Sequence, residues 1–275
     1  MAGGLVVTER PGAAAAWWFV VVTMAWTWTF GFASAGLGGG LGRALHLLAL
    51  LGPVVGWVGV LTTGTGGDYR RTFLRRVVDV RVVQPTWWLA VFAVGAGLPL
   101  AAVGVAAVAG WEATVDPTPT ALAVTGALGF ALAAGVVEDP GWRGIALDGL
   151  TQTMGRLGTS LVLGVLWSLW HLPLYFIEGT FQHALGVATP QFWMSMTIRV
   201  PLAVLLVWLV TGTDGAIVAA VAAHALGNTV GEVLTTGVAA MGVELLITGL
   251  AATAVGTAWA VQGKHRPPIS PDQRT

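Results

Sequence analysis

The chain has 275 residues, of which 55% are hydrophobic and only 9% are charged, and its formal net charge is zero. A soluble domain usually carries about 25% charged residues, so this composition excludes an ordinary globular protein. A neutral chain gives no reason to expect nucleic acid as a partner. The absence of Cys excludes disulfides, a thiolate nucleophile and metal sites built on Cys.

Apolar segments long enough to cross a bilayer recur along the whole chain. The sequence therefore predicts an all-α, polytopic transmembrane helical bundle of about eight spans, surrounded by membrane lipids. Ala33-Ser34-Ala35 resembles a signal-peptidase site, so cleavage of the first segment is an alternative to the retained helix that we expect. The predicted spans are residues 13–34, 44–63, 87–110, 120–138, 158–177, 191–211, 215–234 and 237–261.

The positive charges indicate the orientation of the bundle. With eight spans both termini lie on one side, and that side receives 11 of the 13 Lys and Arg residues. The positive-inside rule makes this side the cytoplasm, and the composition suggests the inner membrane of a bacterium. We divide the chain into N-terminal transmembrane helices with a basic loop (1–112), a core of spans (113–262) and a disordered cytoplasmic tail (263–275).

The largest cytoplasmic connection, residues 66–86, contains five arginines. Phe73 and Val77 between these charges predict an amphipathic helix that lies on the membrane surface. The alternative, which we favour, is that these arginines only set the orientation of the protein in the membrane.

An acid pair stands at the end of the fourth apolar segment. Asp139 is a good N-cap and precedes Pro140, so we expect a new helix over 140–150 at the cytoplasmic membrane surface. Asp139 and Arg143 are four residues apart and can pair, which leaves Glu138 without an obvious local partner. A carboxyl group in apolar surroundings suits general acid–base catalysis. A helix cap with a salt bridge is the structural alternative.

Two further motifs place histidines in apolar segments. Trp167 and His171 are four residues apart on one helical face, and the same holds for His224 and Asn228. A His and an Asn aimed together can donate hydrogen bonds to a developing oxyanion. The structural alternatives are a hydrogen-bonded packing histidine and polar contacts between helices. Ionisable groups at membrane depth are rare and are functional-site candidates.

Together, the order Glu-Asp-x-x-x-Arg-Gly, Trp-x-x-x-His and His-x-x-x-Asn resembles the CPBP intramembrane proteases. This family includes CAAX prenyl endopeptidases and Abi-like proteins that process bacteriocins or confer immunity to them. The resemblance covers roughly residues 115–235, within the core that we place at 113–262. The family pattern starts with two glutamates, whereas the second acid here is Asp139, and it has Phe where this chain has Trp167.

The resemblance implies an intramembrane endopeptidase that cleaves a membrane-associated or lipophilic peptide. Glu138 would activate a water molecule, and His171 would help to hold that water. His224 and Asn228 would stabilise the oxyanion of the tetrahedral intermediate. The supporting residues would be Asp139, Arg143 and Trp167.

The participation of a metal is open. Glu138, His171 and His224 are three side chains that bind zinc in other proteins, with a fourth position left for water. A water activated by a glutamate needs no metal, so we favour a mechanism without metal or other cofactor.

Two other functions compete with proteolysis. One is a non-catalytic immunity or scaffold protein of the same fold. The other is a proton-coupled transporter, in which Glu138, Arg199, Glu232 and Glu244 would form the relay. Arg199 has no assigned role in a protease, and pairing with an acid is as reasonable as contact with a substrate.

Straight helices would not bring these side chains together. At about 1.5 Å per residue, Glu138 falls near the cytoplasmic end of its span and His171 about 20 Å from the start of its own. Tilt, a kink near Pro173 or a re-entrant segment over 140–157 must therefore close the gap.

Overall fold

A computed structural model of the chain describes residues 10–111, 120–234 and 237–264, and it shows no strand among them. Short 3-10 helices, η1 (Val80–Val82) and η4 (Leu172–Phe176), and π-helical turns, η2 (Ala93–Gly97) and η3 (Pro140–Ala146), connect the α-helices. The α-helices are α1 (Ala13–Leu37), α2 (Gly39–Leu50), α3 (Gly52–Thr63), α4 (Gly67–Val78), α5 (Pro85–Phe92), α6 (Leu98–Val108), α7 (Ala121–Asp139), α8 (Leu147–Trp170), α9 (Phe181–Ala184), α10 (Pro190–Gly212), α11 (Ile217–Val233) and α12 (Val238–Lys264).

Six helical segments among the described residues are long and apolar enough to cross a membrane. One of them, Ala121–Phe176, covers the two predicted spans 120–138 and 158–177, and the shorter apolar helix Ile217–Val233 coincides with the predicted span 215–234. Each of the eight predicted spans thus coincides with helix. The predicted all-α polytopic bundle is confirmed, and the chain is a multi-pass membrane protein.

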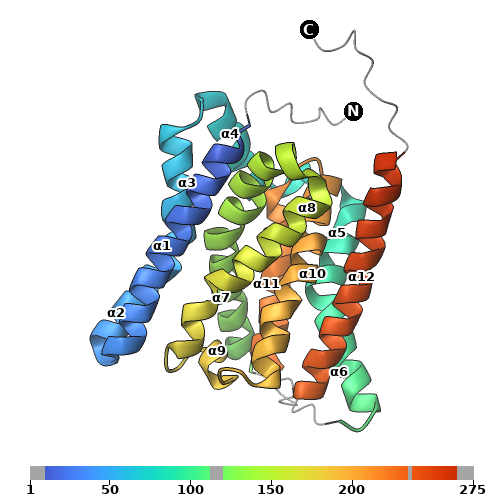
Figure 1. Cartoon of the computed structure of the whole chain (residues 1–275). Helices are drawn as coiled ribbons and strands as arrows, with labels where there is room; N and C mark the ends of the chain where they lie inside the picture. The colour runs from blue at the N-terminus through green and yellow to red at the C-terminus, as the bar shows by residue number, and fades with distance from the viewer. Residues whose placement is uncertain (1–9, 112–119, 235–236, 265–275) are drawn as a thin grey trace.

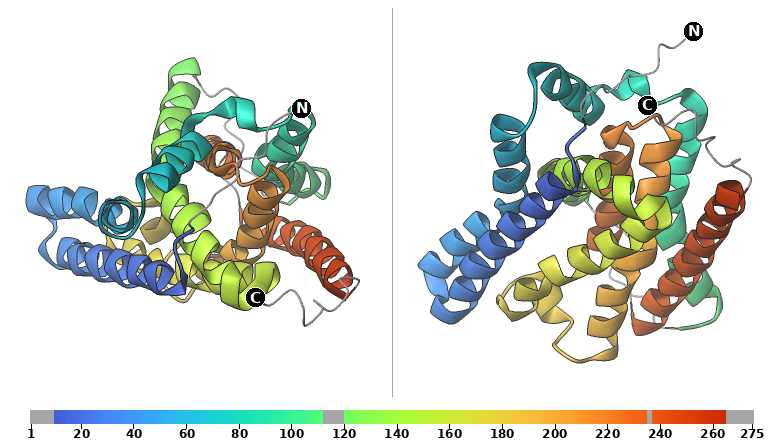
Figure 2. Two further views of the ribbon diagram at one scale, coloured as in Figure 1. Left: turned by 90° about the horizontal axis from the view of Figure 1, so that it is seen from above. Right: turned by 45° about the horizontal axis from the view of Figure 1, so that its top comes forward.

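The start of α1, the helix α4 and the end of α12 lie at the same end of the bundle, as an even number of crossings requires (Figure 1). The α1–α3 segment forms one edge of the molecule and α12 the opposite edge (Figure 2). Helix α11 contacts α4, α5, α6, α7 and α10, so it lies in the interior of the bundle. Which end faces the cytoplasm stays a prediction.

Small residues allow the helices to approach closely around α10 and α11. A Cβ atom at Gly164 of α8 would lie 2.6 Å from Cα of Val200 in α10. A Cβ atom at Gly95 of η2 would lie 2.5 Å from the carbonyl oxygen of Ala223 in α11. Both contacts require glycine, which is the usual means of close helix packing in membranes.

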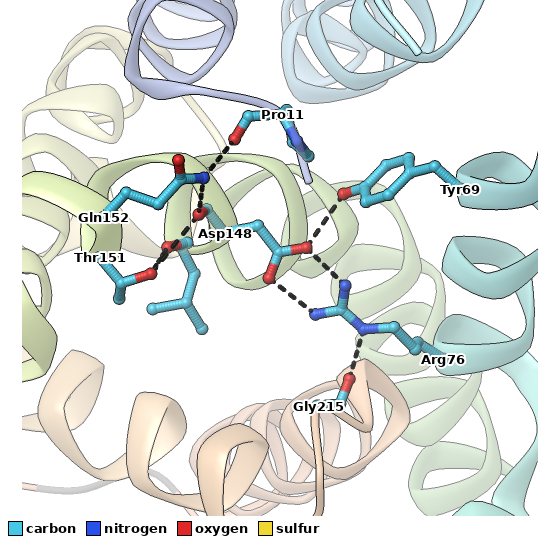
Figure 3. Close-up of polar contacts among 8 residues, drawn as sticks. Pro11, Tyr69, Arg76, Asp148, Thr151, Gln152 and Gly215 are labelled. Carbon is cyan, nitrogen blue, oxygen red and sulfur yellow. Dashed lines mark hydrogen bonds and ion pairs between the residues drawn. The ribbon is translucent and has the colours of Figure 1, made fainter. Parts of the chain in front are cut away.

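Helix α4 confirms that the basic loop is helical, but its buried face contacts protein rather than lipid. Asp148 of α8 accepts hydrogen bonds from Tyr69 Oη at 3.0 Å, Arg76 Nη1 at 2.5 Å and Arg76 Nη2 at 3.1 Å (Figure 3). Arg76 Nε donates to the carbonyl oxygen of Gly215 at 2.6 Å. The prediction that this face lies on the membrane is therefore wrong, and Arg76 is a buried ion-pair partner of Asp148. Its role in setting the topology stays a prediction.

The ionisation of this cluster follows from its surroundings. Burial raises the pKa of the Tyr69 phenol, and the Asp148 carboxylate raises it further, so the hydroxyl stays protonated and donates. Burial disfavours the charge on Arg76, but the Asp148 carboxylate more than offsets this and raises the pKa of the guanidinium. The cluster is a charged, hydrogen-bonded clamp between α4, α8 and the start of α11.

The predicted surface helix over 140–150 is also wrong. Asp139 has helical backbone angles (φ −64°, ψ −33°) and does not cap a new helix, and every residue of Pro140–Ala146 is buried. Proline lacks the amide hydrogen and its ring crowds the preceding turn, so the helix widens into the π-helical turn η3. The helical path breaks only at Gly155, where φ is +67°. Glu138 consequently lies inside the bundle, roughly 25 Å of helical path before that break.

The C-terminal boundary is shifted as well. Gly263 and Lys264 are the last residues of α12 rather than the start of a disordered tail, and residues 265–275 lie outside the described part of the chain. The division at residue 112 and the retention of the first apolar segment stay predictions.

Candidate active site

Glu138 occupies the last turn of α7 and is 7% exposed. Its Oε2 accepts a hydrogen bond of 2.8 Å from Nε1 of Trp167, which lies on α8. Its Oε1 has no hydrogen-bond partner among the residues that the structure describes. Glu138, which has no partner in the local sequence, is thus held through Oε2 by Trp167, and its Oε1 is free to bind water.

Trp167 is the centre of the cluster. Its ring centroid lies 5.5 Å from that of His171 and 5.2 Å from that of His224, with both pairs edge to face. Arg143 Cζ lies 4.0 Å from the same ring, which is cation–π geometry. Because Trp167 touches all three side chains and donates to Glu138, it fixes their mutual positions.

His171 immediately follows the last residue of α8. Its Nδ1 lies 2.8 Å from the carbonyl oxygen of Trp167. A carbonyl oxygen only accepts hydrogen bonds, so Nδ1 carries the proton and Nε2 of the neutral ring has a lone pair for water. Helix α8 ends at Trp170 and Pro173 lies in η4, so the predicted span 158–177 is not one continuous helix.

His224 lies on α11 and is oriented by Asp139, 85 residues earlier in the chain. Its Nδ1 is 3.1 Å from Asp139 Oδ2, while Asp139 Oδ1 is 3.3 Å from Arg143 Nη1. Asp139 was expected to act with Arg143 on Glu138, and its contact with His224 is an additional role. A carboxylate on Nδ1 fixes the ring and leaves Nε2 for a substrate.

Arg143 is buried and forms an ion pair with Asp139, but the angles between the two groups are not those of a hydrogen bond. The guanidinium nitrogens and Asp139 Oδ1 have no hydrogen-bond partner among the described residues. The positive charge is therefore stabilised by the Asp139 carboxylate and by the face of Trp167.

The predicted site residues of three distant segments face one cavity of about 730 Å³. Asp139 and Arg143 do not line it and lie behind Glu138, His224 and Trp167. Straight helices would have left Glu138 and His171 at different depths in the membrane. The two side chains reach the same cavity because the segment 140–155 is folded into the bundle. The predicted residues in the cavity wall are Glu138, Trp167, His171, His224 and Asn228.

Comparison with known proteins places this site in a family. Residues 120–230 match the family model described as type II CAAX prenyl endopeptidase Rce1-like. A CAAX prenyl protease 2 from Methanococcus maripaludis is 29% identical over 104 residues, which are 38% of this chain and 38% of that protein. The family-model match falls on the segment that carries the three motifs. This segment is thus similar to the CAAX proteases, which supports the CPBP resemblance.

The CPBP resemblance inferred from the motifs is therefore confirmed for this segment, while the role of each residue stays a prediction. The matched segment does not include α1–α6. The contacts of α1 with α8 and of α4 with α11 therefore join the matched segment to a part of the chain that the family model does not match.

The geometry of this site does not suit the three side chains that the sequence offered as alternative zinc ligands. Among the described residues, no group of three or more His, Asp or Glu side chains is placed to hold a metal ion, and Glu138, His171 and His224 do not form one. Trp167 already donates to Glu138, and Asp139 holds His224. The mechanism without a metal stays a prediction.

Several residues of the CPBP cavity were missed in the sequence. His46 of α2 lines it, although a lone histidine in an apolar segment is a detectable signal. Ser195 also lines it, and its spacing of four residues from Arg199 on α10 could have been read as one polar face. The indole N–H of Trp167 is a third omission, because Phe at this position of the family pattern cannot donate.

Proposed function

We propose that the protein is an intramembrane endopeptidase that hydrolyses a peptide bond with water activated by Glu138. The observation that carries the proposal is the Glu138 carboxylate, held through Oε2 by Trp167 and facing a cavity shared with His171, His224 and Asn228. The CPBP family match supports the same chemistry. General base catalysis requires such a positioned carboxylate within reach of water.

The first step forms the bond between water and the substrate. A water molecule between Glu138 Oε1 and His171 Nε2 transfers a proton to Glu138 while its oxygen attacks the carbonyl carbon. The electron pair of the carbonyl bond moves to oxygen and produces a tetrahedral oxyanion. The surrounding apolar walls exclude other water, which strengthens the electrostatic interactions within the cavity.

The oxyanion is stabilised by α11. His224, as the imidazolium, donates from Nε2, and Asn228 donates from its side-chain amide one helical turn later. Asp139 holds the ring by Nδ1 and balances its positive charge. Donors that are already oriented need no reorganisation when the negative charge develops.

The second step breaks the carbon–nitrogen bond. The oxyanion reforms the carbonyl group, and the leaving nitrogen takes the proton that Glu138 received from water. The products are one new carboxyl terminus and one new amine, so one water is consumed in each turnover and Glu138 is regenerated.

The substrate class follows from the location of the cavity. It lies inside a membrane-spanning bundle and is lined mainly by apolar side chains, which favours a membrane-associated or lipophilic peptide. We place the protein in the bacterial cytoplasmic membrane with both termini in the cytoplasm, on the distribution of Lys and Arg.

The test is cleavage of apolar decapeptides by the purified full-length protein in detergent micelles. Wild type is compared with Glu138→Gln and with Glu178→Gln, a matched control at an exposed acid in the loop after η4. We expect cleavage by wild type and by the control, no cleavage by Glu138→Gln, and no effect of a chelator. Full activity of a well-folded Glu138→Gln protein removes the proposal, and loss of activity with chelator replaces it by a metal-dependent mechanism.

The competing functions give different results in the same preparation. A transporter produces proton-coupled flux in proteoliposomes and no cleavage of any peptide. A non-catalytic immunity or scaffold protein keeps its phenotype when Glu138 and His171 are replaced.

A further inference from the structure

Arg199 is a buried cation that has no anionic partner among the residues that the structure describes. It lies on α10, is 9% exposed and lines the cavity that holds Glu138. Within residues 10–111, 120–234 and 237–264, no carboxylate lies within ion-pair distance of its guanidinium. An unpaired buried charge is costly, so a site that keeps one is suited to an anion from outside.

The guanidinium is held in one orientation by its own helix. Arg199 Nη1 donates to the carbonyl oxygen of Ser195 and, at 3.1 Å, to Ser195 Oγ. Tyr175 Oη in turn donates to Ser195 Oγ at 2.8 Å. Arg199 Nε and Nη2 have no hydrogen-bond partner among the described residues. These two nitrogens form the edge that binds the two oxygens of a carboxylate in parallel.

Packing of α8 against α10 places Arg199 at the depth of the catalytic cluster. The two helices run in opposite directions, with Ser168 Oγ donating to the carbonyl oxygen of Met196 at 2.6 Å. Gly164 lies against Val200. Arg199 of α10 therefore lies at the level of the α8 turn that carries Trp167. Trp167 is the residue that donates to Glu138.

The acids of the same cavity do not supply the partner. Glu232 is exposed at the end of α11 and Glu244 is half-buried on α12, and neither forms an ion pair with Arg199. Of the two alternatives that the sequence left open for Arg199, pairing with one of these acids is not seen among the described residues. Because Arg199 lines the cavity, its guanidinium is available to a molecule bound there.

We propose that Arg199 binds a carboxylate of the peptide substrate, either its free C-terminus or an acidic side chain. This inference rests on the proposed endopeptidase function and gives it a specificity. A peptide advances by about 3.5 Å per residue, so the bound carboxylate lies within a few residues of the scissile bond. Binding neutralises the buried cation and fixes the register of the peptide relative to Glu138.

The experiment compares three pools of decapeptides built on the same apolar sequences. One pool has a free C-terminus, one is C-terminally amidated, and one is amidated with a single Asp placed at each position in turn. We expect wild type to prefer a carboxylate-bearing pool over the plain amide by about tenfold or more in kcat/KM, mainly through KM. The pool that is preferred identifies the source of the carboxylate.

Variants assign the preference to Arg199. Arg199→Gln is expected to cleave all pools at the rate of the plain amide, and Arg199→Lys to retain part of the preference because a point charge lacks the planar fork. Arg156→Gln, at an exposed arginine of α8 outside the cavity, is expected to keep the full preference.

The outcomes separate this inference from the proposed function. Equal cleavage of all pools by wild type overturns the carboxylate site and leaves the endopeptidase intact. Absence of all cleavage by wild type overturns both. A preference that survives Arg199→Gln overturns the assignment to Arg199. If Arg199→Gln does not fold, an unchanged preference in Arg199→Lys overturns it instead.

Discussion

Asp148→Asn tests the clamp that joins the N-terminal helices to the CPBP segment. In the wild type, Asp148 accepts three hydrogen bonds from Tyr69 and Arg76, and both members of the ion pair are buried. The substitution preserves the shape but leaves the Arg76 guanidinium without a counter-charge. Breaking a buried ion pair in this way costs about 3–5 kcal/mol. At about 2–4 °C per kcal/mol, the apparent melting temperature should fall by about 6–20 °C.

The assay is thermal unfolding of purified protein in detergent, followed by intrinsic tryptophan fluorescence. The matched control is Arg71→Gln, which breaks an α4 ion pair with Asp68 whose side chains are 81% and 82% exposed. An exposed pair contributes little, so the control should stay within about 3 °C of wild type. Replacing both partners, Arg76→Met with Asp148→Leu, should be less harmful than Asp148→Asn because no charge is left unpaired. Equal melting temperatures for Asp148→Asn and the control would refute the clamp.

Two substitutions probe the catalytic cluster. Trp167→Phe keeps an aromatic ring beside Arg143 but removes the hydrogen bond to Glu138, so kcat should fall about 10- to 150-fold with little change in KM, as steady-state kinetics will show. An unchanged kcat would mean that the indole N–H does not position the base. Asp139→Asn removes the carboxylate from both His224 and Arg143, and we expect at least a tenfold lower kcat together with a lower melting temperature. A loss of stability without any loss of kcat would limit Asp139 to a structural role.

The sequence predicted the spans well because hydropathy is a local property. The predicted spans all coincide with helices, and the motifs located the residues that meet in the cavity. The errors arise where tertiary contacts decide the structure. A charged segment such as 140–150 reads as a surface helix, yet Pro140 opens a π-helical turn and the surrounding helices bury it. From the sequence, Arg76 is one of several arginines expected only to set the topology. In the structure it is buried and pairs with Asp148.

Contacts between distant residues could not be predicted from spacing. The i, i+4 rule found the Asp139–Arg143 pair, but the hydrogen bond of Asp139 to His224 joins residues 85 positions apart. The hydrogen bond from Trp167 to Glu138 also depends on how α7 packs near α8. Such partners follow from helix packing, which one sequence does not specify.

The most direct test of the account is the rate of the first turnover by Glu138→Gln, measured under single-turnover conditions on a peptide that wild type cleaves. Glutamine keeps the size of the side chain and can still accept from Trp167, but it cannot take a proton from water. General base catalysis contributes about 10²- to 10⁴-fold, so we predict a loss within or above this range, with Glu178→Gln at the wild-type rate. A Glu138→Gln rate within threefold of wild type would contradict the assignment of Glu138 as the base.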